Sequence, residues 1–236
     1  MIKRFRDRSA AGRELAEALR SYRGREDVVV LALARGGVPV GYEVARSLGV
    51  PLDVFVVRKL GVPSEPELAM GAIATGGVRV LMEDVLDSLS IPDEVVARVA
   101  AEEERELERR ERRYRGDRAP EEIEGRTVIL IDDGLATGAT MRAAARAVRA
   151  HDPKRLVIAV PVGSPETCAS MEAEADEVVC LMTPEPYLAV GFWYEEFGQT
   201  TDEEVEALLK RAAGGGRKRA QRPRAQRGPE PRTTGG

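Results

Sequence analysis

The stretch that most constrains the fold is an apolar run, Thr127–Ile131, that ends in two adjacent carboxylates, Asp132 and Asp133. A turn rich in small and hydroxyl-bearing residues follows, and a helical pattern then covers Met141–Ala150. A short, continuous apolar run is typical of a strand that is buried on both faces of a parallel sheet. The unit of strand, turn and helix therefore indicates an α/β fold with a polar turn at the carboxyl end of a strand.

This turn carries the groups that a phosphorylated sugar would need. Its carboxylates can accept hydrogen bonds from vicinal hydroxyls, and the backbone N–H groups of Ala136–Thr140 can hold a phosphate at the positive end of a helix dipole. Thr137 and Thr140 add hydroxyl donors, and Gly138 allows a close approach of the backbone. The alternative is an ordinary helix start, because Asp, Thr and Gly are also common cap and turn residues.

The complete pattern, Asp-Asp-x-x-x-Thr-Gly-x-Thr between a strand and a helix, resembles the phosphoribosyl pyrophosphate (PRPP) binding loop of type I phosphoribosyltransferases. It lacks the Gly-x-Gly-x-x-Gly of a dinucleotide fingerprint and the Gly-Lys-Ser/Thr of a P-loop. The resemblance extends over roughly Phe5–Lys210. It implies a doubly wound, mostly parallel α/β sheet over residues 1–213, with a helical insertion at about 83–118 and a small hood at about 183–200.

The resemblance also implies an enzyme that transfers a 5-phosphoribosyl group from PRPP to a nitrogenous base and releases pyrophosphate with the help of Mg²⁺. By carry-over, Asp132 and Asp133 hold the ribose hydroxyls and the metal shell and act in catalysis together with Lys59. Glu195 is the further carboxylate near the metal. The PRPP-binding residues that the resemblance implies are Arg35, Gly36, Gly37, Asp132, Asp133, Gly134, Ala136, Thr137, Gly138, Ala139 and Thr140.

A second loop of the implied site follows the apolar run Val28–Leu33. Arg35, Gly36 and Gly37 stand there at the start of a helical pattern, and the family has its pyrophosphate loop at this place. An Arg with two glycines at a helix start is suited to a polyanion. The alternative is a plain strand-to-helix turn with a solvated Arg.

A third loop is expected over Arg58–Gly71, where the family has a mobile lid. Its Gly and Pro residues favour a long loop, and Lys59 would meet the departing pyrophosphate when the lid closes. The alternative is that Arg58 and Lys59 are exposed strand-end cations, with Glu65 and Glu67 as salt-bridge partners.

The segment Pro186–Phe197 holds the only Trp and two of the four Phe residues of the chain. In purine-type members of the family this region stacks on the base, so Leu188, Phe192 and Trp193 are the expected base-binding residues. A hydrophobic plug that seals the last strand is the alternative. No Lys is placed to read a purine oxygen, so the acceptor base stays open.

Apolar runs and helical patterns alternate along the chain, which favours a parallel sheet. Arg35, Lys59 and Asp132 each follow a predicted strand, at the edge where such sheets bind ligands. The predicted strands are Val28–Leu33, Asp53–Val57, Val78–Met82, Thr127–Ile131, Leu156–Val160 and Glu177–Leu181. The predicted helices are Ala10–Tyr22, Val40–Leu48, Asp93–Tyr114, Met141–Ala150, Pro165–Ala175 and Asp202–Ala212.

The charge-rich insertion is predicted to be an exposed helix, supported by pairs such as Glu106 with Arg110 and Glu108 with Arg112 at i,i+4. One apolar stripe runs along it, made of Val96, Ala100, Leu107 and Tyr114. We expect a solvated arm packed along the sheet. The alternative is a hood or dimer element that turns Arg109, Arg110, Arg112 and Arg113 toward the phosphates.

Composition limits the chemistry and the compartment. The chain has 236 residues, 43% of them hydrophobic, so it can bury a full core. It has no apolar run of membrane length and no apolar leader, which predicts a cytoplasmic protein. Cys168 and Cys180 are expected to be reduced core residues. His151 is the only histidine, so the sequence does not supply the residues for a serine or cysteine catalytic triad or for a His-based zinc site.

The last 23 residues, 214–236, carry seven Lys or Arg against one Glu and are expected to form a disordered basic tail. We expect an accessory segment, with attraction of RNA as the alternative. The expected partners are PRPP and a base, together with a second copy of the chain in a homodimer. The rival function is a PRPP-sensing regulator that binds nucleic acid; a PRPP-synthesising kinase would need an ATP loop that the sequence lacks.

Overall fold

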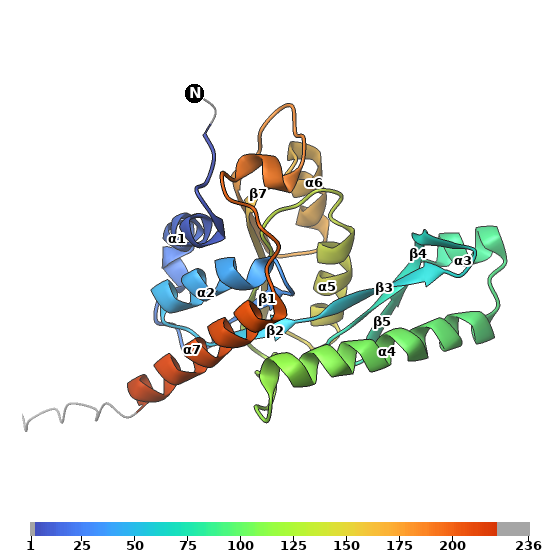
Figure 1. Ribbon diagram of the computed structural model, residues 1–236, viewed down its shortest axis with the longest axis horizontal. Helices are drawn as coiled ribbons and strands as arrows, with labels where there is room; N and C mark the ends of the chain where they lie inside the picture. The colour runs from blue at the N-terminus through green and yellow to red at the C-terminus, as the bar shows by residue number, and fades with distance from the viewer. Residues whose placement is uncertain (1–2, 221–236) are drawn as a thin grey trace, which may run out of the picture.

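The structure is a computed structural model that describes residues 3–220, apart from the side chains of residues 66–67 and 215–220. Its centre is a five-stranded, parallel sheet with the order β2-β1-β6-β7-β8 (Figure 1). The chain leaves β1 for β2 on one side and later returns to β6 on the other, so the switch point lies between β1 and β6. The strands are β1 (Val28–Leu33), β2 (Leu52–Phe55), β6 (Thr127–Ile131), β7 (Arg155–Val162) and β8 (Glu177–Met182).

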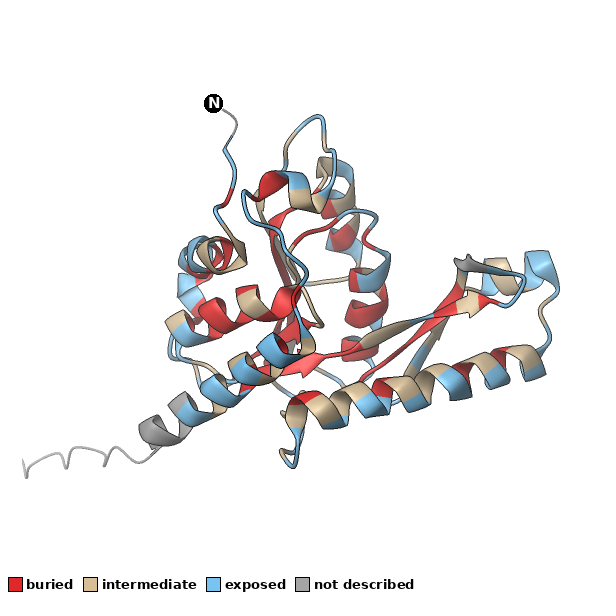
Figure 2. Ribbon diagram, in the orientation of Figure 1, coloured by how far each residue is buried: buried red, intermediate tan, exposed pale blue. Residues whose placement is uncertain are grey.

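Helices cover both faces of this sheet. In β1, Val28, Val30 and Ala32 face one hydrophobic core, and Val29, Leu31 and Leu33 face the other, as the pleat requires. All six are buried, which is why the strand reads as a continuous apolar run (Figure 2). The first core is closed by α1 (Arg8–Ala18), α2 (Gly37–Leu48) and α7 (Asp202–Ala220), and the second by α5 (Ala139–Arg149) and α6 (Pro165–Ser170).

The predicted doubly wound α/β sheet is confirmed, and most element boundaries shift by only a few residues. The helix expected over Ala10–Tyr22 ends at Ala18 and is followed by the 3-10 turn η1 (Arg20–Tyr22); similarly, α6 is followed by η2 (Met171–Ala173). Helix α7 continues to Ala220, so the first residues of the expected tail are helical, whereas residues 221–236 lie outside the described part. Between residues 3 and 220, no helix is both long and apolar enough to cross a bilayer.

The expected long loop over Arg58–Gly71 is wrong, because this segment forms an antiparallel hairpin. Strand β3 (Val57–Val62) and strand β4 (Glu65–Ala74) are joined by the two residues Pro63 and Ser64. Strand β5 (Val78–Leu81) was expected among the parallel strands, but it pairs with β4 in this separate three-stranded sheet. The Gly and Pro residues that suggested a loop lie in strands with an irregular register and in the tight turn.

We call residues 57–115 the arm: β3, β4 and β5 with α3 (Glu83–Leu89) and α4 (Asp93–Arg115), which project from the parallel sheet (Figure 1). The predicted apolar stripe of α4 is confirmed, since Val96, Ala100, Leu107 and Tyr114 are its buried residues. At its end, Arg115 Nε lies 3.0 Å from both carboxylate oxygens of Asp53 on β2. Both side chains of this pair are at most 8% exposed, so the pair fixes the arm to the edge of the main sheet.

The hood at 183–200 is tied to the N-terminal segment. Phe5 pairs with Tyr194, donates its N–H to the carbonyl oxygen of Trp193 at 2.8 Å, and accepts from the N–H of Glu195 at 2.8 Å. Phe5, Trp193 and Tyr194 form a third, smaller core with Ala11 and Val162. The short helix η3 (Val190–Trp193) is part of this hood, and the third core joins the hood to Val162 at the carboxyl end of β7.

Candidate functional site

The acidic pair lies at the carboxyl end of β6, beside the switch point of the sheet. Asp132 and Asp133 are partly buried, and the N–H of Asp133 donates to Oδ1 of Asp132 at 2.8 Å. Burial raises the pKa of Asp132 well above its ordinary value, and the charge of Asp133 adds to this effect. Burial also raises the pKa of Asp133, while Arg8 acts in the opposite direction. A cation or hydroxyl donors at this place would relieve the cost of two neighbouring charges.

The predicted pyrophosphate loop contacts the acidic pair directly. A β-carbon placed on Gly36 would lie 2.3 Å from Oδ2 of Asp133, and one placed on Gly37 would lie 2.6 Å from the carbonyl oxygen of Ile131. Only glycine allows the two loops to approach this closely. Arg35 follows a cis peptide bond, and its NH1 lies 3.6 Å from Oδ1 of Asp202. The structure thus brings Gly36, Gly37 and the acidic pair together, as the sequence predicts.

The predicted phosphate loop leads into α5, which begins two residues earlier than expected, at Ala139. Gly138 caps the helix with a φ of +74°, a conformation that favours glycine. Ala136, Thr137, Ala139 and Thr140 are exposed, while Gly134 and Gly138 are buried. The backbone N–H groups at this helix start are therefore open to an anion from solvent.

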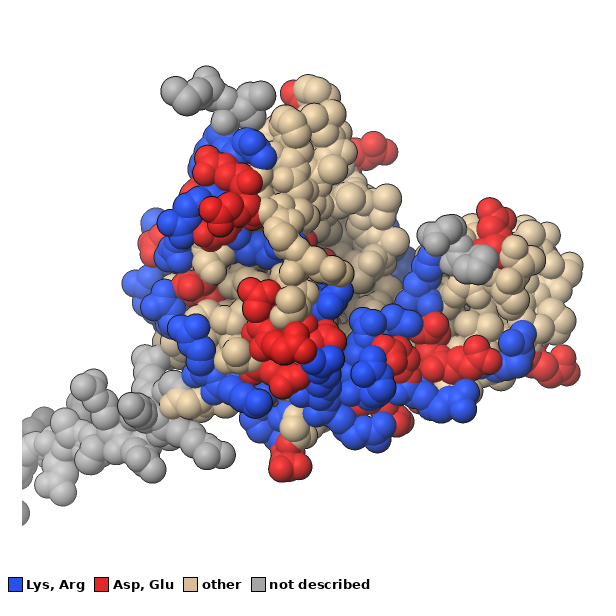
Figure 3. Space-filling model, viewed as in Figure 1, with Lys and Arg blue, Asp and Glu red and all other residues tan. Residues whose placement is uncertain are grey.

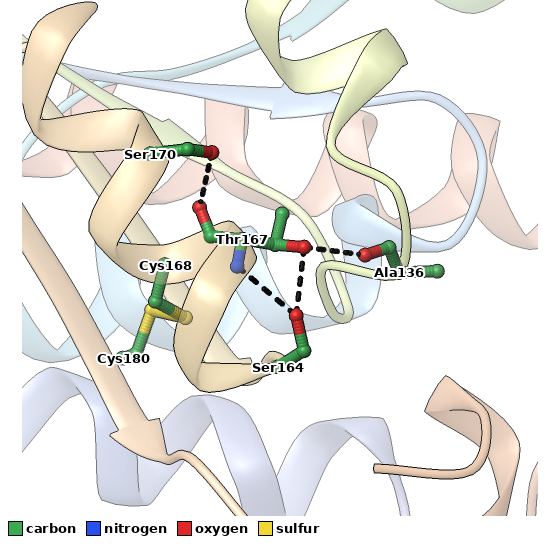
Figure 4. Close-up of a disulfide and its surroundings, with 6 residues drawn as sticks. All are labelled: Ala136, Ser164, Thr167, Cys168, Ser170 and Cys180. Carbon is green, nitrogen blue, oxygen red and sulfur yellow. Dashed lines mark hydrogen bonds between the residues drawn. A yellow bond between two sulfur atoms is a disulfide. The ribbon is translucent and has the colours of Figure 1, made fainter.

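Helix α6 lies beside the phosphate loop and contacts it through Thr167 (Figure 4). Thr167 Oγ1 donates to the carbonyl oxygen of Ala136 at 2.8 Å, and Ser164 Oγ accepts from the N–H of Thr167 at 3.0 Å. The next residue, Cys168, forms a disulfide with Cys180 on β8, with a Cα–Cα distance of 6.6 Å. The expectation of two reduced core cysteines is therefore wrong: the helix and the strand bring two distant thiols side by side, which residue spacing alone does not reveal.

The three expected base-binding residues of the hood differ in how far their side chains are exposed. Trp193 is only 7% exposed and belongs to the third core, whereas Leu188 and Phe192 are 61% and 39% exposed. The ring of Phe192 meets that of Trp193 edge-on at 5.2 Å. Within this region, Tyr187 Oη and Trp193 Nε1 are buried without a hydrogen-bond partner. Leu188 and Phe192 thus present apolar surface, whereas Trp193 packs in the third core.

The expected third carboxylate, Glu195, is exposed, and its backbone N–H is bonded to the N-terminal segment. Among the side chains that the structure describes, no three Asp, Glu, His or Cys residues gather as a metal site. The structure does not bring Glu195 into such a cluster with Asp132 and Asp133.

Lys59 lies on β3 of the arm rather than in a loop. It is exposed, pairs with Ala72 across the hairpin, and lines a cleft of about 450 Å³ together with Arg58 and Glu103. A larger cleft of about 740 Å³ lies between the arm and the core, and none of residues 132–140 lines it. Neither cleft is lined by residues of the pyrophosphate loop or of the acidic pair.

Three arginines in the second half of α4 pair with carboxylates of α4 and α7. Arg110 pairs with Glu106 and Arg112 with Glu108, which confirms both predicted pairs. Arg113 pairs with Asp202, Glu203 and Glu206, so acidic and basic side chains interleave where α4 meets α7 (Figure 3).

Two residues of the site escaped the sequence reasoning. Arg8 Nε donates to Oδ2 of Asp133 at 2.7 Å. Asp202 accepts from Tyr114 Oη at 2.6 Å and faces Arg35, so it links the arm, α7 and the pyrophosphate loop. Burial raises the pKa of Tyr114 to about 12, which keeps its hydroxyl a donor. No local signal marks either residue, because an isolated Arg or Asp at a helix start is common.

Comparison with known proteins agrees with this geometry. The model of the phosphoribosyl transferase domain family matches residues 1–192. A Mycobacterium tuberculosis H37Rv protein named "putative phosphoribosyl transferase" is 50% identical over 211 residues, which are 89% of this chain and 47% of that protein. The chain thus spans about half the length of the curated relatives it matches.

A solved structure is also similar. The crystal structure of the protein TT1426 from Thermus thermophilus is 50% identical, with a TM-score of 0.76 over 87% of this chain and 97% of that one. The matched sequence includes both loops that meet at the acidic pair. Asp132–Thr140, at the end of β6, is the loop by which the sequence resembled this family. The chain belongs to the phosphoribosyltransferase family, with the type I fold.

Proposed function

We propose that this protein transfers a 5-phosphoribosyl group from PRPP to a nitrogenous base and releases pyrophosphate. The single observation that carries the proposal is the contact between Gly36 and the carboxylate of Asp133. This contact joins a pyrophosphate-type loop to a loop for ribose hydroxyls and phosphate, so that one molecule carrying all three groups could span both. The ribose would lie at the acidic pair, between its two phosphate-bearing ends.

In this proposal the residues of the chain position the donor. Asp132 and Asp133 accept hydrogen bonds from the ribose hydroxyls, and the backbone N–H groups of Ala136–Thr140 bind the 5-phosphate. Arg35, with Gly36 and Gly37, binds the pyrophosphate. Such prepositioning, together with fixed donors around the leaving group, can lower the barrier of a transfer that needs no histidine.

Mg²⁺ is the proposed cofactor, and the donor set fits it. The two carboxylates are hard oxygen ligands, and they stand where the phosphates of PRPP would add further oxygens. When bound, the ion would neutralise charge on the departing pyrophosphate. We place Asp132 and Asp133 next to the metal and propose the exposed Glu195 as an outer contributor.

The proposal also assigns residues to the acceptor base and to the cation that would meet the leaving pyrophosphate. Leu188 and Phe192 offer exposed apolar surface to a flat base, and the buried Trp193 would support Phe192 from below. Lys59 is proposed as the catalytic cation, which requires the arm to move toward the site. A homodimer and a cytoplasmic location also belong to the proposal rather than to the observations.

The test is to incubate the full chain with PRPP, Mg²⁺ and a panel of purine and pyrimidine bases while measuring pyrophosphate. We expect one base to give turnover, and Asp132→Asn with Asp133→Asn to abolish both turnover and PRPP binding. If PRPP binds but no base reacts, the regulatory alternative with nucleic-acid binding is favoured. If PRPP does not bind the wild-type protein, the proposed function is wrong.

A further inference from the structure

Arg8 reaches the acidic pair from the opposite end of the sequence. It is the first residue of α1. Asp7 caps this helix by accepting a hydrogen bond from the N–H of Ala10 at 2.7 Å, which fixes the start of the helix at Arg8. The Arg8 side chain is 13% exposed and that of Asp133 is 14% exposed. A nearly buried ion pair of this kind is unlike the solvated pairs of α4, because solvent screens it little.

Three contacts hold the Arg8 guanidinium in one orientation. Nε donates to Oδ2 of Asp133 at 2.7 Å, and NH1 donates to the carbonyl oxygen of Gly198 at 2.7 Å. The ring of Phe197 lies 3.9 Å from the guanidinium carbon, in a cation–π contact. The hood therefore holds the arginine, and the arginine holds the carboxylate. Tyr194, also in the hood, donates from Oη to the carbonyl oxygen of Asp133 at 2.6 Å.

We infer that Arg8 is a positioning residue for the proposed transfer: it fixes the Asp133 carboxylate in the orientation that accepts a ribose hydroxyl, and it offsets one negative charge of the acidic pair. The inference rests on the proposed function. The same Oδ2 that binds Arg8 is also the atom nearest to a β-carbon placed on Gly36, so the ion pair lies where the two loops meet. A polyanionic donor adds negative charge to this site, which increases the need for a fixed cation.

The position of Arg8 also gives the hood and the N-terminal segment a role in binding. Arg8 is attached to the hood through Gly198 and Phe197, and the preceding segment is bonded to the hood through Phe5. Any ligand that orders the hood would order Arg8 and thereby the acidic pair. The ribose half of PRPP would depend on this linkage, whereas pyrophosphate alone would depend mainly on Arg35–Gly37.

The experiment compares two ligands in the full chain by calorimetry: PRPP with Mg²⁺, and inorganic pyrophosphate with Mg²⁺. Arg8→Gln should weaken binding of PRPP with Mg²⁺ on the order of 10- to 100-fold, the typical loss when the hydrogen-bond partner of a metal-ligating side chain is removed. Pyrophosphate binding should change by less than about threefold, because its proposed loop does not include Arg8. Arg8→Lys, which keeps the charge, should recover part of the PRPP affinity.

Arg6→Gln is the matched control, because Arg6 lies two residues away and pairs with Asp7 in solvent, with its side chain 65% exposed. It should bind both ligands like the wild type. In Arg8→Ala, added guanidinium at a concentration far below denaturing levels should restore PRPP binding, with NaCl at equal ionic strength as the reference. Restored binding would show that the missing cation acts at the site, because guanidinium at this concentration would not refold an unfolded protein.

The outcomes are distinct. Unchanged PRPP affinity in Arg8→Gln would overturn the inference while leaving the proposed function in place. Equal losses for PRPP and pyrophosphate, without guanidinium rescue, would show that Arg8 supports the fold and not the carboxylate, which also overturns it. If the wild-type protein does not bind PRPP, the proposed function fails and the inference fails with it.

Discussion

Gly36 and Asp133 lie so close that a β-carbon on Gly36 would stand 2.3 Å from the Oδ2 atom of the aspartate. The two residues come from different strand ends, β1 and β6, which are neighbours at the switch point of the sheet. Their contact requires glycine at one position, so the site depends on a missing side chain as much as on the charged ones.

Gly36→Ala should therefore push the pyrophosphate loop away from the acidic pair. We expect kcat/KM to fall on the order of 10²-fold, because displacement of reacting groups by about 1 Å has effects of this size. Steady-state kinetics would measure it. Gly214→Ala is the control: a β-carbon there meets nothing within 4 Å, so kinetics should not change. Wild-type kinetics in Gly36→Ala would mean that the loops need not touch.

Asp132→Asn should stabilise the unliganded protein at pH 7 and above. Burial raises the pKa of Asp132 in the folded state, so its ionised form costs stability above that pKa, and the cost disappears below the unfolded value near pH 4. Each 1 kcal/mol gained would raise the melting temperature by roughly 2–4 °C in a domain of this size. Melting curves of both proteins should converge as the pH falls toward 4.

Asp27→Asn should have the opposite effect on stability, because the pKa of Asp27 is lowered where that of Asp132 is raised. The Arg25 guanidinium lowers the pKa of Asp27 in the folded state, so its ionised form contributes stability that is present above the unfolded pKa and lost as the pH falls through the folded pKa. This variant should melt lower than the wild type at pH 7. A lower melting temperature for Asp132→Asn at pH 7 would contradict the electrostatic account of the acidic pair.

Lys59→Ala tests whether the arm delivers a catalytic cation. If Lys59 meets the leaving pyrophosphate only in the transition state, kcat should fall on the order of 10²- to 10³-fold while PRPP binding changes little. Arg79→Ala, on strand β5 of the same three-stranded sheet, is the matched control, since Arg79 is an exposed arm cation paired with Glu104. Turnover within about twofold of wild type would make Lys59 a surface cation of the arm.

Reduction of the Cys168–Cys180 disulfide should lower the melting temperature. A disulfide typically contributes about 2–4 kcal/mol by limiting the unfolded chain, and this one spans a sequence separation of 12 residues. Because Thr167 contacts Ala136, the reduced protein should also bind phosphorylated ligands more weakly. The measurement is a melting curve with and without a phosphine reductant.

The double variant Cys168→Ala with Cys180→Ala should not respond to the reductant at all. Equal melting temperatures of the oxidised and reduced wild-type protein would show that the bond adds no stability.

The sequence determined the elements whose signals are local. The apolar run Thr127–Ile131 became β6 with its predicted bounds, and the glycine and hydroxyl pattern after it became the turn into α5. Backbone geometry, period and caps act over a few residues, so they can be read without the rest of the chain. The meeting of the two loops also followed, because parallel strands end at one edge.

Only the tertiary structure decided the contacts between distant segments. The Gly and Pro residues of Arg58–Gly71 favour a loop by local criteria, but the segment forms strands, of which β4 pairs with β5. At Gly71 this pairing leaves no room for a side chain, because a β-carbon would lie 2.6 Å from the carbonyl oxygen of Val80. The disulfide, and the approach of Arg8 to Asp133 across 125 positions, likewise depend on packing. Such partners are selected by burial and charge in the assembled fold, so they cannot be predicted from the local sequence around either residue.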